Sequence, residues 1–117
     1  MEEWRSVLVQ SGDTIKVALD KIDKASTQLA LVVDADGKLL GTLADGDIRR
    51  ALLDGATLGE PINKYMCTTP TTIQHDEPRS EIIAKMRRHQ VHQVPILDDN
   101  GVVVGLEVVD RYLLAPE

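Results

Sequence analysis

The stretch Ala30-Leu31-Val32-Val33-Asp34-Ala35-Asp36-Gly37-Lys38-Leu39-Leu40-Gly41 decides the fold, because its pattern occurs twice in the chain. An apolar run leads into an Asp-Gly turn and a second apolar run follows, which is a strong short-range signal for a β-hairpin. The pattern returns as Val94-Pro95-Ile96-Leu97-Asp98-Asp99-Asn100-Gly101-Val102-Val103-Val104-Gly105. Gly37 and Gly101 set an offset of 101 − 37 = 64 residues. The sequence therefore contains an internal duplication.

An amphipathic helix is predicted before each hairpin. In the first copy, apolar residues recur at the i, i+3, i+4 and i+7 spacing of one helix face: Ile15, Ala18, Leu19 and Ile22. In the second copy, Pro78 suits a first helical turn and the basic run 87–89 suits a helix C-terminus.

Short apolar stretches at 6–9 and 71–73 precede these helices, and closing helices are expected over 47–54 and about 109–114. Each unit thus follows the order β-α-β-β-α. We predict an α/β (α+β) fold in which two pseudo-symmetric units pack as one domain. The expected boundaries are 4–57 for the first unit, 58–70 for a linker that contains Pro61 and Pro70, and 71–114 for the second unit.

The composition limits the possible partners. The formal net charge is -6 and only 3% of the residues are aromatic, so the chain suits neither a phosphate backbone nor base stacking. We expect no nucleic-acid partner. No apolar run approaches the roughly 20 residues that span a bilayer, and the first residues lack the apolar core of a signal peptide. We therefore expect a cytoplasmic location and no membrane partner.

Catalytic and metal-binding patterns are not found in the sequence. Cys67 is the single cysteine, and the three histidines (His75, His89 and His92) lack the spacing of a zinc site. There is no phosphate-binding Gly-rich loop and no nucleophile elbow. We predict no catalytic residue, no metal and no enzymatic activity in this segment.

The repeated unit, the run Gly41–Ile48 and the segment Gln90–Ile96 resemble tandem cystathionine-β-synthase-type (CBS) domains over roughly residues 4–114. More narrowly, Trp4 and the run 41–50 are similar to the CBS pairs that precede sugar-nucleotidyltransferase domains. A family of sugar-phosphate isomerases carries a similar Asp-Gly-Asp run and is the alternative host. The resemblance implies a regulatory module that binds AMP, ADP or ATP between its two units, forms a homodimer and allosterically controls an attached catalytic domain.

The resemblance also places a ligand motif on 41–47: Gly, an apolar residue, any residue, Thr or Ser, two further residues and Asp. Here Thr42 takes the apolar position, Ala44 the hydroxyl position and Asp47 the closing position. A carboxylate can accept hydrogen bonds from both hydroxyls of a ribose, which suits Asp47 to that role. The missing hydroxyl at Ala44 removes one ligand contact.

In the second copy, Arg111 stands where the motif has Asp, and a guanidinium cannot accept a hydrogen bond. We therefore predict one nucleotide site per chain. The resemblance implies that second-unit positions complete this site. Met66, Thr71 and Val91 would enclose the adenine and His92 would lie near the phosphate. Gln93, where many relatives have Arg, favours a monophosphate or diphosphate.

Other interpretations of these residues remain open at this stage. Asp45 at a strand-to-helix junction is predicted to be a helix N-cap. Asp47 in a first helical turn could serve only to complement the helix dipole. Together with the missing hydroxyl and Arg111, this leaves a ligand-free dimerisation scaffold as the alternative function.

Overall fold

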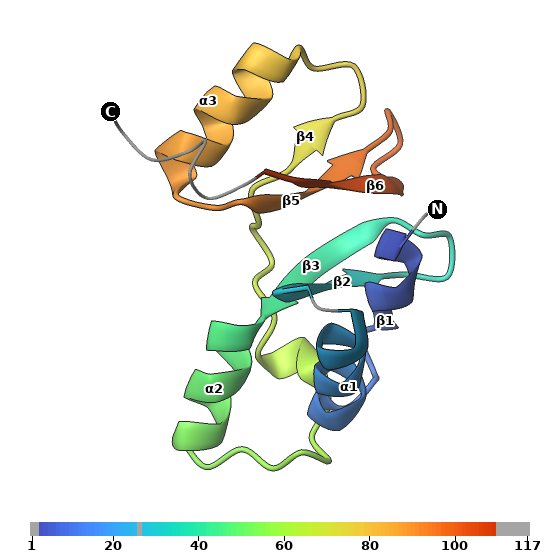
Figure 1. Cartoon of the computed structure of the whole chain (residues 1–117). Helices are drawn as coiled ribbons and strands as arrows, with labels where there is room; N and C mark the ends of the chain where they lie inside the picture. Colours follow the sequence, from blue (N-terminus) through green and yellow to red (C-terminus); the bar gives the residue numbers. More distant parts are fainter. Residues whose placement is uncertain (1–2, 26, 110–117) are drawn as a thin grey trace. The chain divides into compact units, whose positions relative to one another are not determined.

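The computed structural model describes residues 3–25 and 27–109 and shows two compact units that divide between Pro70 and Thr71 (Figure 1). Each unit holds a three-stranded mixed sheet. The first unit consists of η1 (Glu3–Val7), β1 (Leu8–Gln10), α1 (Ile15–Ala25), β2 (Leu29–Val33), β3 (Leu39–Ala44), α2 (Asp45–Leu53) and η2 (Ile62–Lys64). The second consists of β4 (Ile73–Gln74), α3 (Arg79–His89), β5 (Gln93–Leu97) and β6 (Val103–Val108). The predicted mixed α/β fold is confirmed.

The two sheets share one topology. In each, the first strand pairs in parallel with the second, and the second pairs in antiparallel fashion with the third. The register shifts once in each hairpin, between Val32 and Val33 and between Ile96 and Leu97, which are again 64 residues apart. The duplication therefore extends to an irregularity of the backbone.

The hairpin turns also repeat. Asp34 Oδ1 accepts hydrogen bonds from the backbone N–H groups of Asp36 and Lys38, at 2.9 and 3.0 Å. The carboxylate of Asp98 accepts the equivalent pair at 2.8 and 2.9 Å. Each turn ends on a glycine with positive φ, 85° at Gly37 and 82° at Gly101, a conformation that a Cβ atom disfavours.

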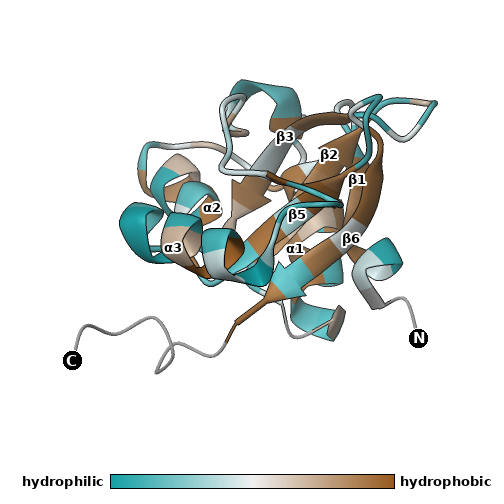
Figure 2. Cartoon of the chain, turned by 90° about the horizontal axis from the view of Figure 1, so that it is seen from above, coloured by the Kyte–Doolittle hydropathy of each residue, from teal (hydrophilic) through white to brown (hydrophobic). Residues whose placement is uncertain are grey.

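The core of the first unit is aliphatic. The apolar face of α1 packs on the sheet, and β2 is apolar along its length (Figure 2). Thr14 begins α1, since its Oγ1 accepts the Val17 N–H at 3.2 Å. Ile48 and Ala51 bury the inner face of α2 in the same core, which fixes the helix that carries Asp47.

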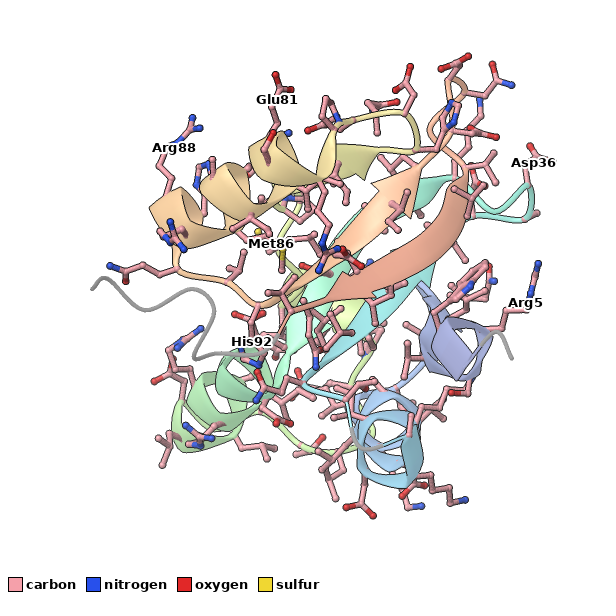
Figure 3. The ribbon with its side chains drawn as sticks, turned by 45° about the horizontal axis from the view of Figure 1, so that its top comes forward. Arg5, Asp36, Glu81, Met86, Arg88 and His92 are labelled. Carbon is pink, nitrogen blue, oxygen red and sulfur yellow. The ribbon has the colours of Figure 1, made fainter. Side chains whose placement is uncertain are left out.

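The core of the second unit is smaller and contains Ile73, Met86, Val94 and Val109. In Figure 3, Met86 points from α3 toward the sheet of its own unit, whereas Glu81 and Arg88 point away from it. The helix ends at Gln90, whose left-handed backbone (φ 57°) lets the Val91 N–H reach the Met86 carbonyl at 3.0 Å. This turn sets where the chain enters β5.

Several predicted boundaries were wrong by a few residues. The first strand was expected at 6–9, but residues 3–7 form a 3-10 helix and β1 covers 8–10, because pairing of Gln10 with Val33 recruits a polar residue into the ladder. Similarly, β4 covers 73–74 instead of 71–73. Helix α2 begins at Asp45, two residues before the predicted start. The closing helix expected at 109–114 lies outside the described residues except for Val109, which is not helical.

Most of the segment predicted as a linker is folded onto the first unit. The carbonyl of Glu60 accepts the Ile15 N–H at 2.9 Å, and the Asp13 carbonyl accepts the Ile62 N–H at 2.9 Å. The Ile62 side chain is fully buried in the first core. The Thr57 amide and the Tyr65 hydroxyl both donate to the Glu60 carboxylate, which lowers the pKa of Glu60 and raises the pKa of Tyr65. The segment is thus a structural part of this unit.

Ile62→Ala is expected to lower the free energy of unfolding by about 2–5 kcal/mol, the usual cost of truncating a buried aliphatic side chain. Urea denaturation followed by circular dichroism measures the change. Leu58→Ala is the control, because Leu58 belongs to the same segment and is 42% exposed. A loss for Ile62→Ala no larger than that of Leu58→Ala contradicts the assignment of Ile62 to the core of the first unit.

Candidate functional site

Asp47 lies in the first turn of α2, and both of its carboxylate oxygens are hydrogen-bonded. Oδ2 accepts the backbone N–H of Ala44 at 2.9 Å, and Oδ1 accepts a hydrogen bond from Arg50 Nη2 at 2.7 Å. The side chain of Asp47 is 23% exposed. The carboxylate is therefore held in one orientation by its own helix and remains partly accessible to solvent.

The N-cap of α2 is Ala44, in extended conformation, and the prediction that Asp45 caps this helix was wrong. Asp47 stands three residues after Ala44 and bonds back to its N–H, which forms half of a capping box. The other half needs an acceptor on the N-cap side chain, and alanine has none. Because Asp47 fixes the helix start from inside the first turn, the helix begins at Asp45.

Thr42 lies on β3 and is 8% exposed. It forms an antiparallel bridge with Cys67: Thr42 N–H donates to the Cys67 carbonyl at 3.0 Å, and Cys67 N–H donates to the Thr42 carbonyl at 2.8 Å. This bridge covers part of the open edge of β3, which is an edge strand of its sheet.

Gly41 allows the connecting segment to cross β3 this closely at Cys67. A Cβ atom at position 41 would lie 2.5 Å from the Cys67 carbonyl oxygen and 3.3 Å from Met66 Sδ. Met66 was predicted as a position of the second unit, but it packs against the core of the first. The reason is that the backbone bridge at Cys67 holds the end of the connecting segment on β3. The first unit thus brings together Thr42, Ala44, Asp47 and Met66.

The other predicted residues lie just before the amino ends of two strands of the second sheet. Thr71 precedes β4, while Val91 and His92 precede β5, and these two strands are parallel neighbours. Val91 packs against the core of the second unit. The His92 carbonyl accepts the Val109 N–H at 2.9 Å, and its side chain is half-buried.

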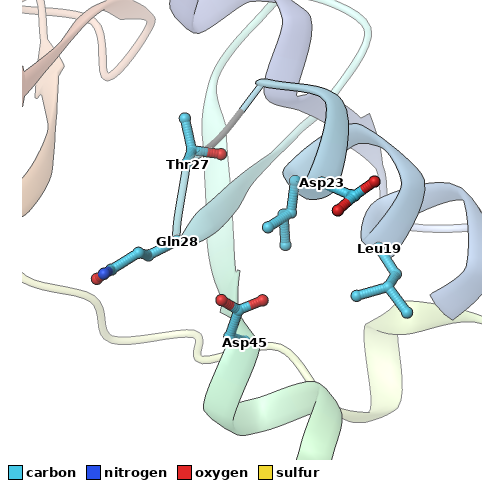
Figure 4. A pocket seen from close by; sticks show the side chains of 6 residues that line it. Leu19, Asp23, Thr27, Gln28 and Asp45 are labelled. Atoms are coloured by element: carbon cyan, nitrogen blue, oxygen red, sulfur yellow. The ribbon is translucent and has the colours of Figure 1, made fainter.

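The first unit also contains an open pocket, of about 410 Å³, at the amino end of α2 (Figure 4). It is lined by Leu19, Ile22 and Asp23 of α1, Thr27 and Gln28 before β2, and Asp45 of α2. The sequence analysis did not assign Thr27 and Gln28, although the 64-residue offset links them to Val91 and His92 (91 − 27 = 64). The described residues that line this pocket include two carboxylates and no basic side chain, which disfavours a phosphate group.

Two further features were searched for in the described part of the chain. Within residues 3–25 and 27–109, no three His, Cys, Asp or Glu side chains gather closely enough to hold a metal ion. No helix in those residues has the length and apolar character needed to cross a bilayer. Arg111, on which the prediction of a single site depends, lies outside the described residues.

The geometry described so far is that of a duplicated unit, with a carboxylate at the start of the helix that follows the first hairpin. The model of the CBS domain family matches residues 4–54 and 62–106. The chain belongs to the CBS domain family. The two matched segments confirm the tandem CBS pair.

Curated relatives of this CBS pair include sugar-phosphate isomerases. Arabinose 5-phosphate isomerase GutQ of Shigella flexneri is 30% identical over 88 residues, which cover 75% of this chain and 27% of that protein. The probable arabinose 5-phosphate isomerase of Haemophilus influenzae is 39% identical over 80 residues, 67% of this chain and 23% of that protein. This CBS pair therefore spans about a quarter of the length of these relatives.

Solved CBS structures have the same fold. The CBS domain pair of protein MJ0100, in complex with 5'-methylthioadenosine and S-adenosyl-L-methionine, matches with a TM-score of 0.80 and 27% identity, over 91% of this chain and 87% of that one. A CBS domain protein from Pyrobaculum aerophilum, complexed with AMP, matches with a TM-score of 0.80 and 22% identity, over 97% and 95% of the two chains.

Gly41→Ala is expected to destabilise the protein by about 1–3 kcal/mol, because the added Cβ collides with a backbone carbonyl that has its own hydrogen bond to Thr42. Thermal or urea unfolding measures the loss. Gly59→Ala is the matched control, since a Cβ at position 59 meets nothing within 4 Å. Equal stability of the two variants would contradict the tight crossing at Gly41.

Proposed function

We propose that this CBS pair is a regulatory module that binds an adenine nucleotide through Asp47 and controls a sugar-phosphate isomerase to which it is joined. The observation that carries the proposal is the carboxylate of Asp47, held at the start of α2 by the Ala44 N–H. A carboxylate in a fixed orientation needs little reorganisation to accept hydrogen bonds from two adjacent ribose hydroxyls. Related CBS structures solved with adenosine compounds support this ligand class.

The remaining contacts are proposed from residues of both units. In the first unit the proposal places Met66, which packs against the core, and Thr42, which is nearly buried on β3, beside the ligand. Thr71, Val91 and His92 come from the amino ends of β4 and β5 in the second unit. In this proposal Val91 contacts the base and His92 the phosphate, and the ligand is AMP, ADP or ATP.

A single nucleotide site per chain is part of the proposal. The pocket beside Thr27 and Gln28 is the repeat-related counterpart of the region around Val91 and His92, yet it is lined by Asp23 and Asp45. Two carboxylates repel a phosphate, and Arg111 replaces the ribose-binding aspartate of the second motif. Both features disfavour a second nucleotide.

The relatives support one of the two candidates for the attached enzyme. The resemblance in the sequence favoured a sugar nucleotidyltransferase and kept a sugar-phosphate isomerase as the alternative. The arabinose 5-phosphate isomerases among the relatives support the isomerase. We propose that the CBS pair forms a homodimer and that nucleotide binding biases the isomerase through a coupling between the two sites.

A ligand-free dimerisation scaffold is the second candidate, favoured by a specific observation. Arg50 and the Ala44 N–H each already donate to one oxygen of Asp47, and Ala44 offers no hydroxyl to a ligand. Calorimetry with AMP, ADP, ATP and S-adenosylmethionine separates the two functions. A stable dimer that binds none of these ligands supports the scaffold and overturns the nucleotide sensor.

Asp47→Ala is expected to weaken AMP binding about ten-fold or more, because hydrogen bonds to a charged group contribute about 1.5–3 kcal/mol. Asp47→Asn is a second variant that keeps an acceptor for the Ala44 N–H and removes the charge. Isothermal titration calorimetry gives the affinities, and a melting curve confirms that each variant is folded. Arg111→Ala serves as the control and should leave the affinity nearly unchanged. Loss of binding in Arg111→Ala, with binding retained in Asp47→Ala, would refute the site assignment.

A further inference from the structure

The side chain of Arg50 lies back over the start of its own helix. Its Nη2 donates to Asp47 Oδ1 at 2.7 Å, so the guanidinium reaches the first turn of α2. A cation is more favourable at the other end of a helix, where the dipole is negative. The carboxylate of Asp47 thus holds Arg50 against the preference of the helix dipole.

Gly46 provides the space for this arrangement. A Cβ atom at position 46 would lie 3.3 Å from Arg50 Nη1 and 3.7 Å from Nη2, so the guanidinium occupies space that a side chain at this position would need. Gly46 stands between the proposed ribose-binding residue and the helix N-cap, Ala44. Arg50 therefore occupies space directly beside the Asp47 carboxylate, where a bound ribose would lie.

A ribose that binds Asp47 through both oxygens competes with the two partners that they already have. The Ala44 N–H belongs to the backbone at the helix start and cannot leave without unwinding the first turn. Arg50 is a long side chain with 70% of its surface exposed, and an exposed ion pair of this kind is weak. Displacement of Arg50 is therefore the easier route by which Asp47 becomes available.

We infer that Arg50 is a specificity-determining residue that selects phosphorylated adenosine compounds over uncharged ones. This inference rests on the proposed role of Asp47. In the free protein Arg50 neutralises Asp47, and in the complex it leaves Oδ1 to the ribose hydroxyls and pairs with the 5'-phosphate of the same ligand. A side chain long enough to touch Asp47 from position 50 can also reach a phosphate attached to the sugar that Asp47 holds.

This change of partner discriminates between ligands, because only a phosphorylated ligand gives Arg50 a new ion pair in place of the one with Asp47. A phosphate offers the guanidinium a charged acceptor, often with two parallel hydrogen bonds. Adenosine offers no such group, so its binding breaks the Asp47–Arg50 pair without replacement. The phosphate preference therefore depends on Arg50, and competition from Arg50 lowers the affinity for adenosine.

The test compares AMP with adenosine on three proteins by isothermal titration calorimetry: the wild type, Arg50→Ala and Arg49→Ala. Arg49 is the matched control, because it is the adjacent exposed arginine on the same helix and no contact with Asp47 is seen for it in the described residues. We expect Arg50→Ala to bind adenosine about 2- to 5-fold more tightly, since the competing ion pair is gone. The preference of Arg50→Ala for AMP over adenosine should fall about ten-fold, while Arg49→Ala should resemble the wild type.

Other outcomes separate this inference from the function on which it rests. A wild-type protein that binds none of AMP, ADP, ATP and adenosine refutes the proposed function, and that result is known before any variant is made. A wild-type protein that binds AMP and adenosine equally well overturns the role of Arg50 alone. The same holds if Arg50→Ala keeps the full AMP preference, or if Arg49→Ala loses as much of it as Arg50→Ala does.

Discussion

The hydrogen bond from the Ala44 N–H to Asp47 Oδ2 is the interaction on which the candidate site depends. It ends β3, begins α2 and fixes the orientation of a carboxylate in one turn of chain. The burial of Ile48 and Ala51 then anchors the helix on the core of the first unit. Because the anchor is apolar and local, the position of Asp47 is set by residues that need no contact with a ligand.

The two hydrogen-bond partners of Asp47 both lie within three residues of it in the sequence. The carboxylate has one backbone partner that is fixed and one side-chain partner, Arg50, that can leave. A CBS pair that regulates an enzyme needs a ligand-dependent change with differential contacts in its two states. The exchange of Arg50 between Asp47 and a phosphate would provide such a change within α2. The bridge between Thr42 and Cys67 lies on β3, the strand that leads directly into this helix.

Repetition constrains the backbone more closely than it constrains the chemistry. Both units share the sheet order, the bulge and the aspartate-anchored turn, and even the lysine contacts repeat: Lys21 donates to the Leu8 carbonyl and Lys85 to the Thr72 carbonyl. These features satisfy backbone groups that every copy of the fold must satisfy. The closing residue of the ligand motif does not repeat, since the sequence has Asp47 in one copy and Arg111 in the other.

The sequence by itself determined the duplication and the order of the elements, because periodicity and turn chemistry are local properties of the chain. The expectation for Asp47 came from the resemblance of its motif to CBS domains. It did not determine that Ala44 is the cap of α2, since that depends on a carboxylate three residues later bonding back to the strand end. Nor could it place Met66 with the first unit or find the pocket beside Thr27 and Gln28. Only the tertiary structure decided the last two points, because they arise where the connecting segment crosses Gly41 and where α1 meets β2 and α2, which are contacts between residues far apart in the sequence.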